Sequence, residues 1–333
     1  MAIIAVASAK GSPGVTTTCL ALALTWPRPV LLVEADPAGG DVMAGYVRAE
    51  LSGDRGLAYL AVAARRDSLD AELGAQVIDL TPEKQAPRTP PITRLLVPGV
   101  TDPVESAGVA PSWPRLADFF VALGQRSSGH RAADRPVREP LDVIVDCGRL
   151  ISTYPPLTVM ASADLVLLAV RSSLRSASST APVVATLRRE LAAGGGDPDR
   201  VGLVVIEGGE YRTSDLGRAL GAPVVATVPW REKEAAALSD GIGKVVDNSP
   251  LMRSARKAAE SLAAQLTRAQ HAAAEPPSAA PEQPVADTAY PDVTYPEAAY
   301  PGVTYPAGTY GGYPVAGAAP PTQADSPPGM VRR

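Results

Sequence analysis

One stretch decides the fold of this chain: Ala9-Lys10-Gly11-Ser12-Pro13-Gly14-Val15-Thr16-Thr17-Thr18. It follows an apolar run at residues 3–7 and precedes a helix-like stretch at residues 19–24, so the expected order is strand, glycine loop, helix. In such a loop, small residues let backbone N–H groups close around a phosphate at the positive end of the helix. The stretch therefore predicts a phosphate-binding loop.

The hydroxyl and the cation that such a loop uses are not both in their usual places. Thr16 lies at the helix start, where a Thr hydroxyl reaches Mg²⁺. The general pattern has a lysine directly before it, but this chain has Val15, whose methyl groups cannot bond phosphates. A hydrogen bond to a charged group is worth roughly 1.5–3 kcal/mol, so its loss predicts an affinity about 10- to 150-fold lower. A lysine does occur at the entry of the loop, as Lys10.

The loop resembles the deviant Walker A loop of the ParA/MinD group of P-loop ATPases, which reads K-G-G-x-G-K-T-T and carries a signature lysine at its start. Five residues match that pattern, namely Lys10 for the signature lysine, Gly11 and Gly14 for two glycines, and Thr16 and Thr17 for the Thr pair. Three residues depart from it, namely Ser12, Pro13 and Val15, the last in place of the phosphate lysine.

Four later segments follow the order of the same family, and the resemblance covers roughly residues 1 to 270. Residues 29–37 resemble the second strand and its D-x-D-P ending, with Glu34 as a tolerated substitution for the first Asp and with Asp36 retained. Residues 141–147 resemble the Walker B strand, which contains Asp146. Residues 163–170 resemble the A-D-x-V strand, and residues 220–229 resemble the segment that ends in I-P, here at Pro229.

The resemblance implies an α/β fold, a P-loop NTPase of the SIMIBI type with a mostly parallel sheet flanked by helices. The residues favour the same class, because short apolar strands without polar alternation are typical of parallel strands buried on both faces. Right-handed crossovers then place the loop at the carboxyl ends of the strands. Other patterns predict one or two helices over 51–73, a strand over 92–97, a helix over 113–123 and an exposed loop over 125–140.

The resemblance also implies ATP and Mg²⁺ as cofactors, with a role for each matching residue. Thr16 is expected to ligate Mg²⁺, Asp146 to hold it through water, and Asp36, also near the metal, to orient the attacking water. Lys10 is expected to reach across a dimer to the nucleotide of the partner, so Lys10 and Asp36 are the expected catalytic residues. Any activity is then a slow Mg²⁺-dependent ATP hydrolysis. The expected nucleotide-binding residues are Lys10, Gly11, Ser12, Pro13, Gly14, Val15, Thr16, Thr17 and Pro229.

Simpler interpretations of these residues stay open. Lys10 can be an exposed lysine in a turn, and Asp36 and Asp146 can cap helices at the ends of their strands. Base specificity is open as well, because relatives usually have an Asn that reads adenine where this chain has Glu207.

Composition excludes several other classes of function. A net charge of −4 gives no global attraction to nucleic acid or to anionic lipid, so DNA is a possible partner that is not favoured. The two cysteines do not form a disulfide framework, which fits a reducing cytoplasm, and with only two histidines they make no soft-metal site. The abundance of Arg, Ala, Gly and Pro indicates a GC-rich bacterial genome.

The end of the chain divides into a helix and a segment of different character. From Pro250 an apolar stripe repeats with helical spacing, but it is mostly Ala, which favours packing on the core over binding to a membrane. Beyond it, Tyr-Pro units recur every five residues, which matches neither a helix nor a strand face. The predicted domains are therefore a P-loop NTPase domain at 1–271 and a disordered, low-complexity tail at 272–333, which either is solvated or binds protein partners.

The expected function is spatial. We expect a nucleotide-responsive homodimer that positions other machinery, either a pilus or secretion assembly, as in the TadZ/CpaE branch that the chain resembles, or a chromosome in partitioning. The alternative is a pseudo-ATPase scaffold that gathers partners through the fold and the Tyr-Pro tail without nucleotide.

Overall fold

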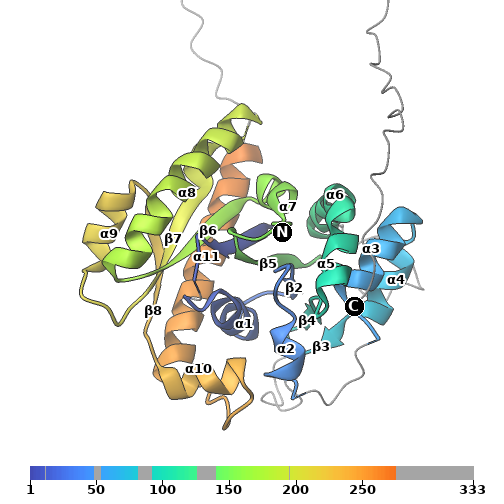
Figure 1. The fold of residues 1–333 in the computed structure, drawn as a ribbon, viewed down its shortest axis with the longest axis horizontal. Helices are drawn as coiled ribbons and strands as arrows, with labels where there is room; N and C mark the ends of the chain where they lie inside the picture. Colours follow the sequence, from blue (N-terminus) through green and yellow to red (C-terminus); the bar gives the residue numbers. More distant parts are fainter. Residues whose placement is uncertain (12, 49–53, 82–91, 126–139, 195, 275–333) are drawn as a thin grey trace, which may run out of the picture. The chain divides into compact units, whose positions relative to one another are not determined.

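An eight-stranded sheet forms the centre of the computed structural model, which describes residues 1–11, 13–48, 54–81, 92–125, 140–194 and 196–274 (Figure 1). The strands lie in the order β3-β4-β2-β5-β1-β6-β7-β8, and every neighbouring pair is parallel except β3 with β4. Their bounds are β1 Ile3–Ser8, β2 Val30–Glu34, β3 Ile78–Asp79, β4 Arg94–Val97, β5 Asp142–Arg149, β6 Leu165–Arg171, β7 Val201–Ile206 and β8 Val224–Val228. The mostly parallel sheet predicted from the sequence is confirmed.

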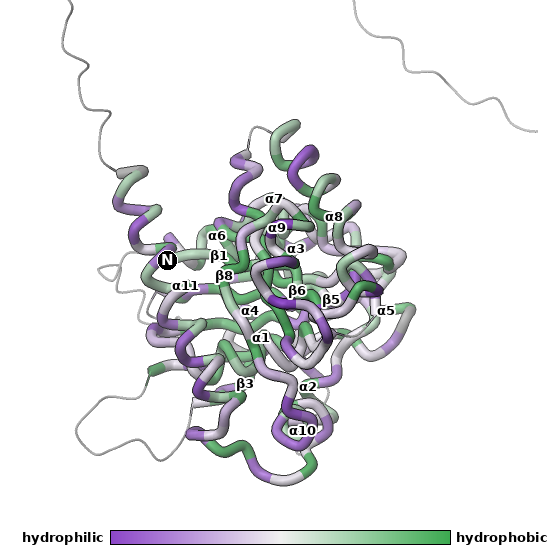
Figure 2. The backbone as a smooth tube through the Cα atoms, turned by 90° about the vertical axis from the view of Figure 1, so that its left-hand side faces the viewer, coloured by the Kyte–Doolittle hydropathy of each residue, from purple (hydrophilic) through white to green (hydrophobic). Residues whose placement is uncertain are grey.

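The central strands are apolar because both faces of the sheet are covered. Every residue of β1, β2 and β7 is buried, and so is every residue but the last in β5 and β6. Figure 2 shows β1, β5 and β6 mostly in hydrophobic colours, whereas hydrophilic colours gather around the helix α10 (Glu232–Ser239). Burial on both faces therefore explains why these strands lack polar alternation.

Helices form a layer on each face of the sheet (Figure 1). On one face α1, α2, α10 and α11 share a hydrophobic cluster with the strands, and the remaining α-helices contribute to the cluster on the other face. Their bounds are α1 Val15–Thr25, α2 Asp41–Ala44, α3 Leu57–Arg65, α4 Leu69–Gln76, α5 Pro103–Val109, α6 Trp113–Gln125, α7 Leu157–Ser162, α8 Leu174–Ala193, α9 Thr213–Leu220 and α11 Pro250–Ala274, with short 3-10 helices at Ala110–Ser112 and Pro198–Arg200. The helices and strand predicted between residues 51 and 123 are present as α3, α4, β4 and α6.

Helix α1 is held at the end opposite to the glycine loop by a buried arginine. Its last turn contains no basic residue. The Arg94 guanidinium, from β4, donates instead to the carbonyl oxygens of Ala23 at 3.2 Å and Trp26 at 3.3 Å. Helix C-termini leave such carbonyls without an intrahelical partner. Arg94 therefore fixes the helix that presents the loop.

A buried carboxylate ties the same region to the sheet. Asp142, at the start of β5, accepts hydrogen bonds from the backbone N–H of Ala2 at 2.8 Å, from Trp26 Nε1 at 2.7 Å and from Arg28 Nε at 2.7 Å. Arg28 also donates to the Thr267 hydroxyl on α11 at 2.9 Å. One carboxylate thus joins β1, β5 and the end of α1, and through Arg28 it is linked to α11.

The amphipathic stretch that begins at Pro250 forms α11, which packs on α1 and β8. Its apolar stripe, which includes Leu251, Ala259 and Leu262, is buried, so the predicted packing on the core is confirmed. Across the described part of the chain, no helix is both long and apolar enough to cross a membrane.

Three sequence predictions fall wholly or largely outside the described residues: the contribution of Ser12 to the loop, the exposed loop at 125–140 and the low-complexity tail. Helix α11 continues to Ala274, so residues 272–274, which the sequence analysis assigned to the tail, are helical.

Candidate functional site

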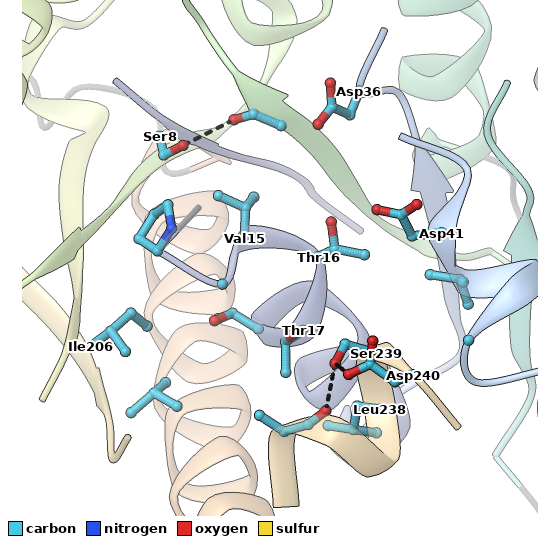
Figure 3. Close-up of a pocket in the computed structure, with 18 of the residues that line it drawn as sticks. Ser8, Val15, Thr16, Thr17, Asp36, Asp41, Ile206, Leu238, Ser239 and Asp240 are labelled. Carbon is cyan, nitrogen blue, oxygen red and sulfur yellow. Dashed lines mark hydrogen bonds between the residues drawn. The ribbon is translucent and has the colours of Figure 1, made fainter. Parts of the chain in front are cut away.

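A cavity of about 680 Å³ opens at the carboxyl ends of the strands (Figure 3). It is bounded by the glycine loop and the first turn of α1, the segment after β2, the end of β5, the end of β8 and helix α10. This is the edge of the sheet where the loop was predicted to lie, and where ligands of open α/β sheets bind.

The loop is shaped by two glycines in the left-handed region. Gly11 has φ of 80° and Gly14 has φ of 98°, values that L side chains rarely adopt. A Cβ at either position would meet nothing within 4 Å, so the backbone conformation, and not space, requires glycine there. Gly14 is the N-cap of α1, and a glycine has no side chain that could cap the helix. The N–H groups of the first turn of α1 therefore remain available for an anion in the cavity.

Thr16 and Asp146 meet at the head of α1. Asp146, on β5, is buried and accepts a hydrogen bond at 3.0 Å from the Gly148 N–H. Burial raises the pKa of Asp146 to about 6, although the neighbouring Thr16 hydroxyl and the Gly148 N–H oppose the shift. The structure thus brings together the two side chains that were predicted to hold Mg²⁺.

The donors present suit Mg²⁺, which prefers hard oxygen ligands and keeps several waters. Among the described residues, no group of three or more His, Cys, Asp or Glu side chains could hold a metal by itself. An ion held by Thr16 and Asp146 would therefore complete its coordination with phosphate oxygens and water.

Asp36 lies beside this pair on the wall of the cavity. Its Oδ1 accepts the N–H of Ala38 at 2.9 Å, and Figure 3 shows its carboxylate turned toward the space above Thr16, as is that of Asp41. Gly148 is required next to it, because a Cβ there would lie 1.9 Å from the Asp36 Cγ. Burial raises the pKa of Asp36, while the Ala38 N–H and the charge of Arg149 lower it.

Glu34 has a structural position that the sequence did not reveal. Its two carboxylate oxygens accept the N–H groups of Val42 and Gly99, each at 3.0 Å. Burial raises its pKa to about 7, and the charges of Asp146 and Asp41 act in the same direction. Glu34 therefore ties the segment after β2 to the segment after β4, and it is not among the residues that line the cavity.

Val15 provides an apolar surface where a P-loop usually has an ammonium group. It borders the cavity and is only 5% exposed, because it packs in the hydrophobic cluster beneath α1. Lys10 does not line this cavity. It is exposed and borders a second cavity of about 500 Å³ across the loop, together with Arg171 and Arg175 and without any carboxylate among the lining residues described.

The far end of the first cavity is aromatic. Pro229 and Trp230 follow β8 and line it, and Trp230 is 41% exposed. The guanidinium of Arg171 lies 3.8 Å from the centroid of the Trp230 ring, which holds the indole in place. Glu207, where relatives have an adenine-reading Asn, is exposed and does not line the cavity.

Sequence analysis did not single out Asp41, Arg149, Trp230 or Asp240, although all four line the cavity. Two of them had a local signal. Arg149 follows the Walker B strand by three positions, and Trp230 directly follows the I-P segment. Asp41 and Asp240 reach the cavity only through folding, and nothing in their sequence context marks them.

Fold and site together define a class: the chain has the P-loop ATPase fold of the MinD and ParA proteins. Among solved structures it is similar to MinD from Pyrococcus horikoshii complexed with Mg-ADP, with a TM-score of 0.56, 18% identity, and coverage of 78% of this chain and 95% of that one. It is also similar to a ParA family ATPase from Chlorobium tepidum, with a TM-score of 0.54, 20% identity, and coverage of 78% and 98%.

A third similar structure is MinD from Aquifex aeolicus in a MinC:MinD complex, with a TM-score of 0.54, 15% identity, and coverage of 79% of this chain and 96% of that one. No protein-family model matches the sequence, and no curated protein matches it. At these identities the likeness establishes the fold, and function has to be argued from the site.

Proposed function

We propose that this chain is a nucleotide-responsive ATPase of the ParA/MinD type that positions other cellular machinery. One observation carries the proposal: the Thr16 hydroxyl lies beside the buried Asp146 carboxylate at the N-terminus of α1, and Asp36 lines the same cavity as Thr16. A hydroxyl and a carboxylate on the cavity wall, a second, buried carboxylate next to that hydroxyl and the backbone N–H groups of the first helical turn suit a magnesium-bound triphosphate.

Each group has a task in this proposal. The N–H groups of Val15, Thr16 and Thr17 bind phosphate oxygens, and Thr16 and Asp146 hold Mg²⁺. The ion, when bound, neutralises charge on the phosphates. Asp36 accepts a hydrogen bond from the water whose oxygen bonds to the γ-phosphorus. The bond from that phosphorus to the bridging oxygen breaks, its electron pair stays with ADP, and a proton of the water passes to the released phosphate. The apolar Val15 gives no cationic help, so turnover is slow.

The same edge of the molecule is suited to pairing with a second copy. Lys10 is exposed there, beside the cationic cavity. Large exposed apolar side chains also follow the carboxyl ends of β5, β6 and β7, namely Ile151, Tyr154, Leu157, Leu174 and Tyr211. Exposed apolar groups that gather on one side favour a protein interface. We propose that two subunits meet through this edge with nucleotide between them.

The machinery that is positioned is proposed to be a protein assembly. A structural neighbour was solved as a complex of MinD with MinC, which supports protein partners for this fold. The net charge of −4 gives no attraction to DNA, and the apolar stripe of α11 is occupied by the core, so membrane binding is not favoured. The segment from residue 275 onward is proposed as a second binding region for partners.

Calorimetric titration of the full chain with ATP in Mg²⁺ tests the site. Thr16→Val keeps the shape of the side chain but removes the hydroxyl, so Mg²⁺-dependent binding should weaken at least tenfold. Thr186→Val, at an exposed position on α8, is the matched control and should bind as wild type does. Absence of nucleotide binding in wild type would reject the proposal in favour of the scaffold that works without nucleotide.

A further inference from the structure

The candidate nucleotide cavity has a cation that neither the loop nor the family pattern supplies. Among its described lining residues the only basic ones are Arg149 and Arg231, and they come from different strand ends. Arg149 closes β5, three residues after Asp146, whereas Arg231 follows Trp230 at the aromatic end. The two arginines therefore come from strands on opposite sides of β1.

Strand pairing places Arg149 against the start of the loop. It is in register with Ser8, the last residue of β1, and the Leu150 N–H donates to the Ser8 carbonyl at 2.8 Å. Gly148, with φ of 59°, turns the chain directly before it. Since the loop begins at Ala9, the backbone of Arg149 lies next to the residue that directly precedes the phosphate-binding loop.

The guanidinium of Arg149 is not used by the fold. Within the described part of the chain it makes no hydrogen bond and no ion pair. Its charge acts on Asp36, whose carboxyl pKa it lowers, and that carboxylate already accepts the Ala38 N–H. A half-buried cation close to Asp36, lining a cavity at the positive end of a helix, is placed for an anionic ligand.

We propose that Arg149 binds the phosphates of the nucleotide from the end of the Walker B strand and so replaces the lysine that is missing at position 15. The inference rests on the nucleotide site proposed above. A guanidinium presents a planar fork of donors that fits phosphate oxygens in pairs, and it stays charged at all working pH values. Lys10 cannot take this role within one subunit, because it borders the other cavity.

The test is a double-mutant cycle on the full chain: wild type, Arg149→Gln, Val15→Lys and both changes together. Binding of ATP and of inorganic tripolyphosphate in Mg²⁺ is measured by calorimetry. Arg149→Gln should weaken both ligands by about 10- to 150-fold, the loss expected for a hydrogen bond to a charged group. Adding Val15→Lys to Arg149→Gln should restore most of that loss.

Arg231→Gln makes the same charge change at the other end of the cavity and is the control. It should leave tripolyphosphate binding within about threefold of wild type, because Arg231 follows β8, which is three strands away from β1 and its loop, so solvent ions screen its charge. Arg149→Lys keeps the positive charge but not the planar pair of donors, so it should lose less affinity for both ligands than Arg149→Gln does. Thermal unfolding of each variant shows whether it is folded.

Two results would overturn the inference while leaving the nucleotide site intact. One is wild-type binding of ATP by a folded Arg149→Gln variant. The other is an equal loss in Arg149→Gln and Arg231→Gln, which would mean that only net charge matters. If wild type itself binds neither ATP nor tripolyphosphate, then the proposed function fails and this inference fails with it.

Discussion

The hydroxyl of Thr16, on α1, lies beside the buried carboxylate of Asp146, on β5, and lowers the pKa of that carboxyl group. The two residues bring together the helix that begins at the glycine loop and the strand beside β1. Because the hydroxyl only partly offsets the cost of burial, the carboxylate is easier to protonate than an exposed one. The site is therefore sensitive to pH.

Binding of Mg·ATP should fall as the pH drops through about 6, because Asp146 must be ionised to hold the magnesium water. Bound Mg²⁺ favours the carboxylate, so the midpoint should lie at or below that value. Calorimetry between pH 5 and 8 measures it. Asp146→Asn should bind Mg·ATP weakly at every pH, and its affinity should no longer fall as the pH drops through about 6. If the affinity of Asp146→Asn falls with pH as that of wild type does, then the pH dependence of binding comes from the nucleotide alone.

Stability should change with pH in the opposite sense because of Glu34. Its pKa is raised from 4.5 to about 7, so the folded state holds a proton that the unfolded state releases. Such a group contributes stability that is complete below pH 4.5 and is lost as the pH rises through 7, by roughly 3 kcal/mol. Urea unfolding of wild type should show the decline. It should be shallower in Glu34→Gln and unchanged in Glu260→Gln, an exposed control on α11.

Arg94→Met should lower the free energy of unfolding by about 2–4 kcal/mol, because the Ala23 and Trp26 carbonyls would each lose a partner. Arg268→Met, at an exposed position on α11, is the matched control and should change stability by less than about 0.5 kcal/mol. Similar losses in the two variants would mean that Arg94 does not hold the end of α1.

Tryptophan fluorescence should report the binding of the nucleotide base to the cavity. Trp26 and Trp113 are buried, whereas Trp230 is 41% exposed and lines the cavity, so nucleotide should quench Trp230 alone. If the base stacks on the Trp230 ring, any base can do so, so ATP and GTP should bind with affinities within about tenfold of each other. Trp230→Phe should abolish the quenching, and Trp113→Phe should keep it. Strong preference for ATP would contradict recognition by stacking alone and would indicate that a polar group of the cavity reads the adenine edge.

The sheet and the place of the loop could be predicted because they depend on local signals. The apolar strands, the glycines of the loop and Thr16 can each be recognised from a few neighbouring residues of the sequence. Asp36 and Asp146 could be found because the first lies just after a recognisable strand and the second lies within one. These residues lie on the cavity or beside it, as a parallel sheet requires of residues at neighbouring strand ends.

Other contacts could not be predicted because their partners are distant in sequence. The role of Glu34 depends on the N–H groups of Val42 and Gly99, which only the folded chain brings to it. Arg94 lies in a strand where a charged residue is unexpected, and it is there because the backbone carbonyls at the buried end of α1 need donors. Arg149 gains its position from pairing with Ser8, a relationship that strand order creates and that no motif contains.

Sedimentation velocity of the full chain, with and without excess Mg·ATP, tests the central claim that nucleotide controls assembly. We predict a monomer without nucleotide and a dimer with it, because the exposed Lys10 of each subunit gains a phosphate partner only when the other subunit is loaded. Lys10→Ala should stay monomeric in both conditions, and Lys257→Ala, an exposed control on α11, should behave as wild type does. An oligomeric state that is indifferent to nucleotide and to Lys10 would contradict the account and favour the scaffold.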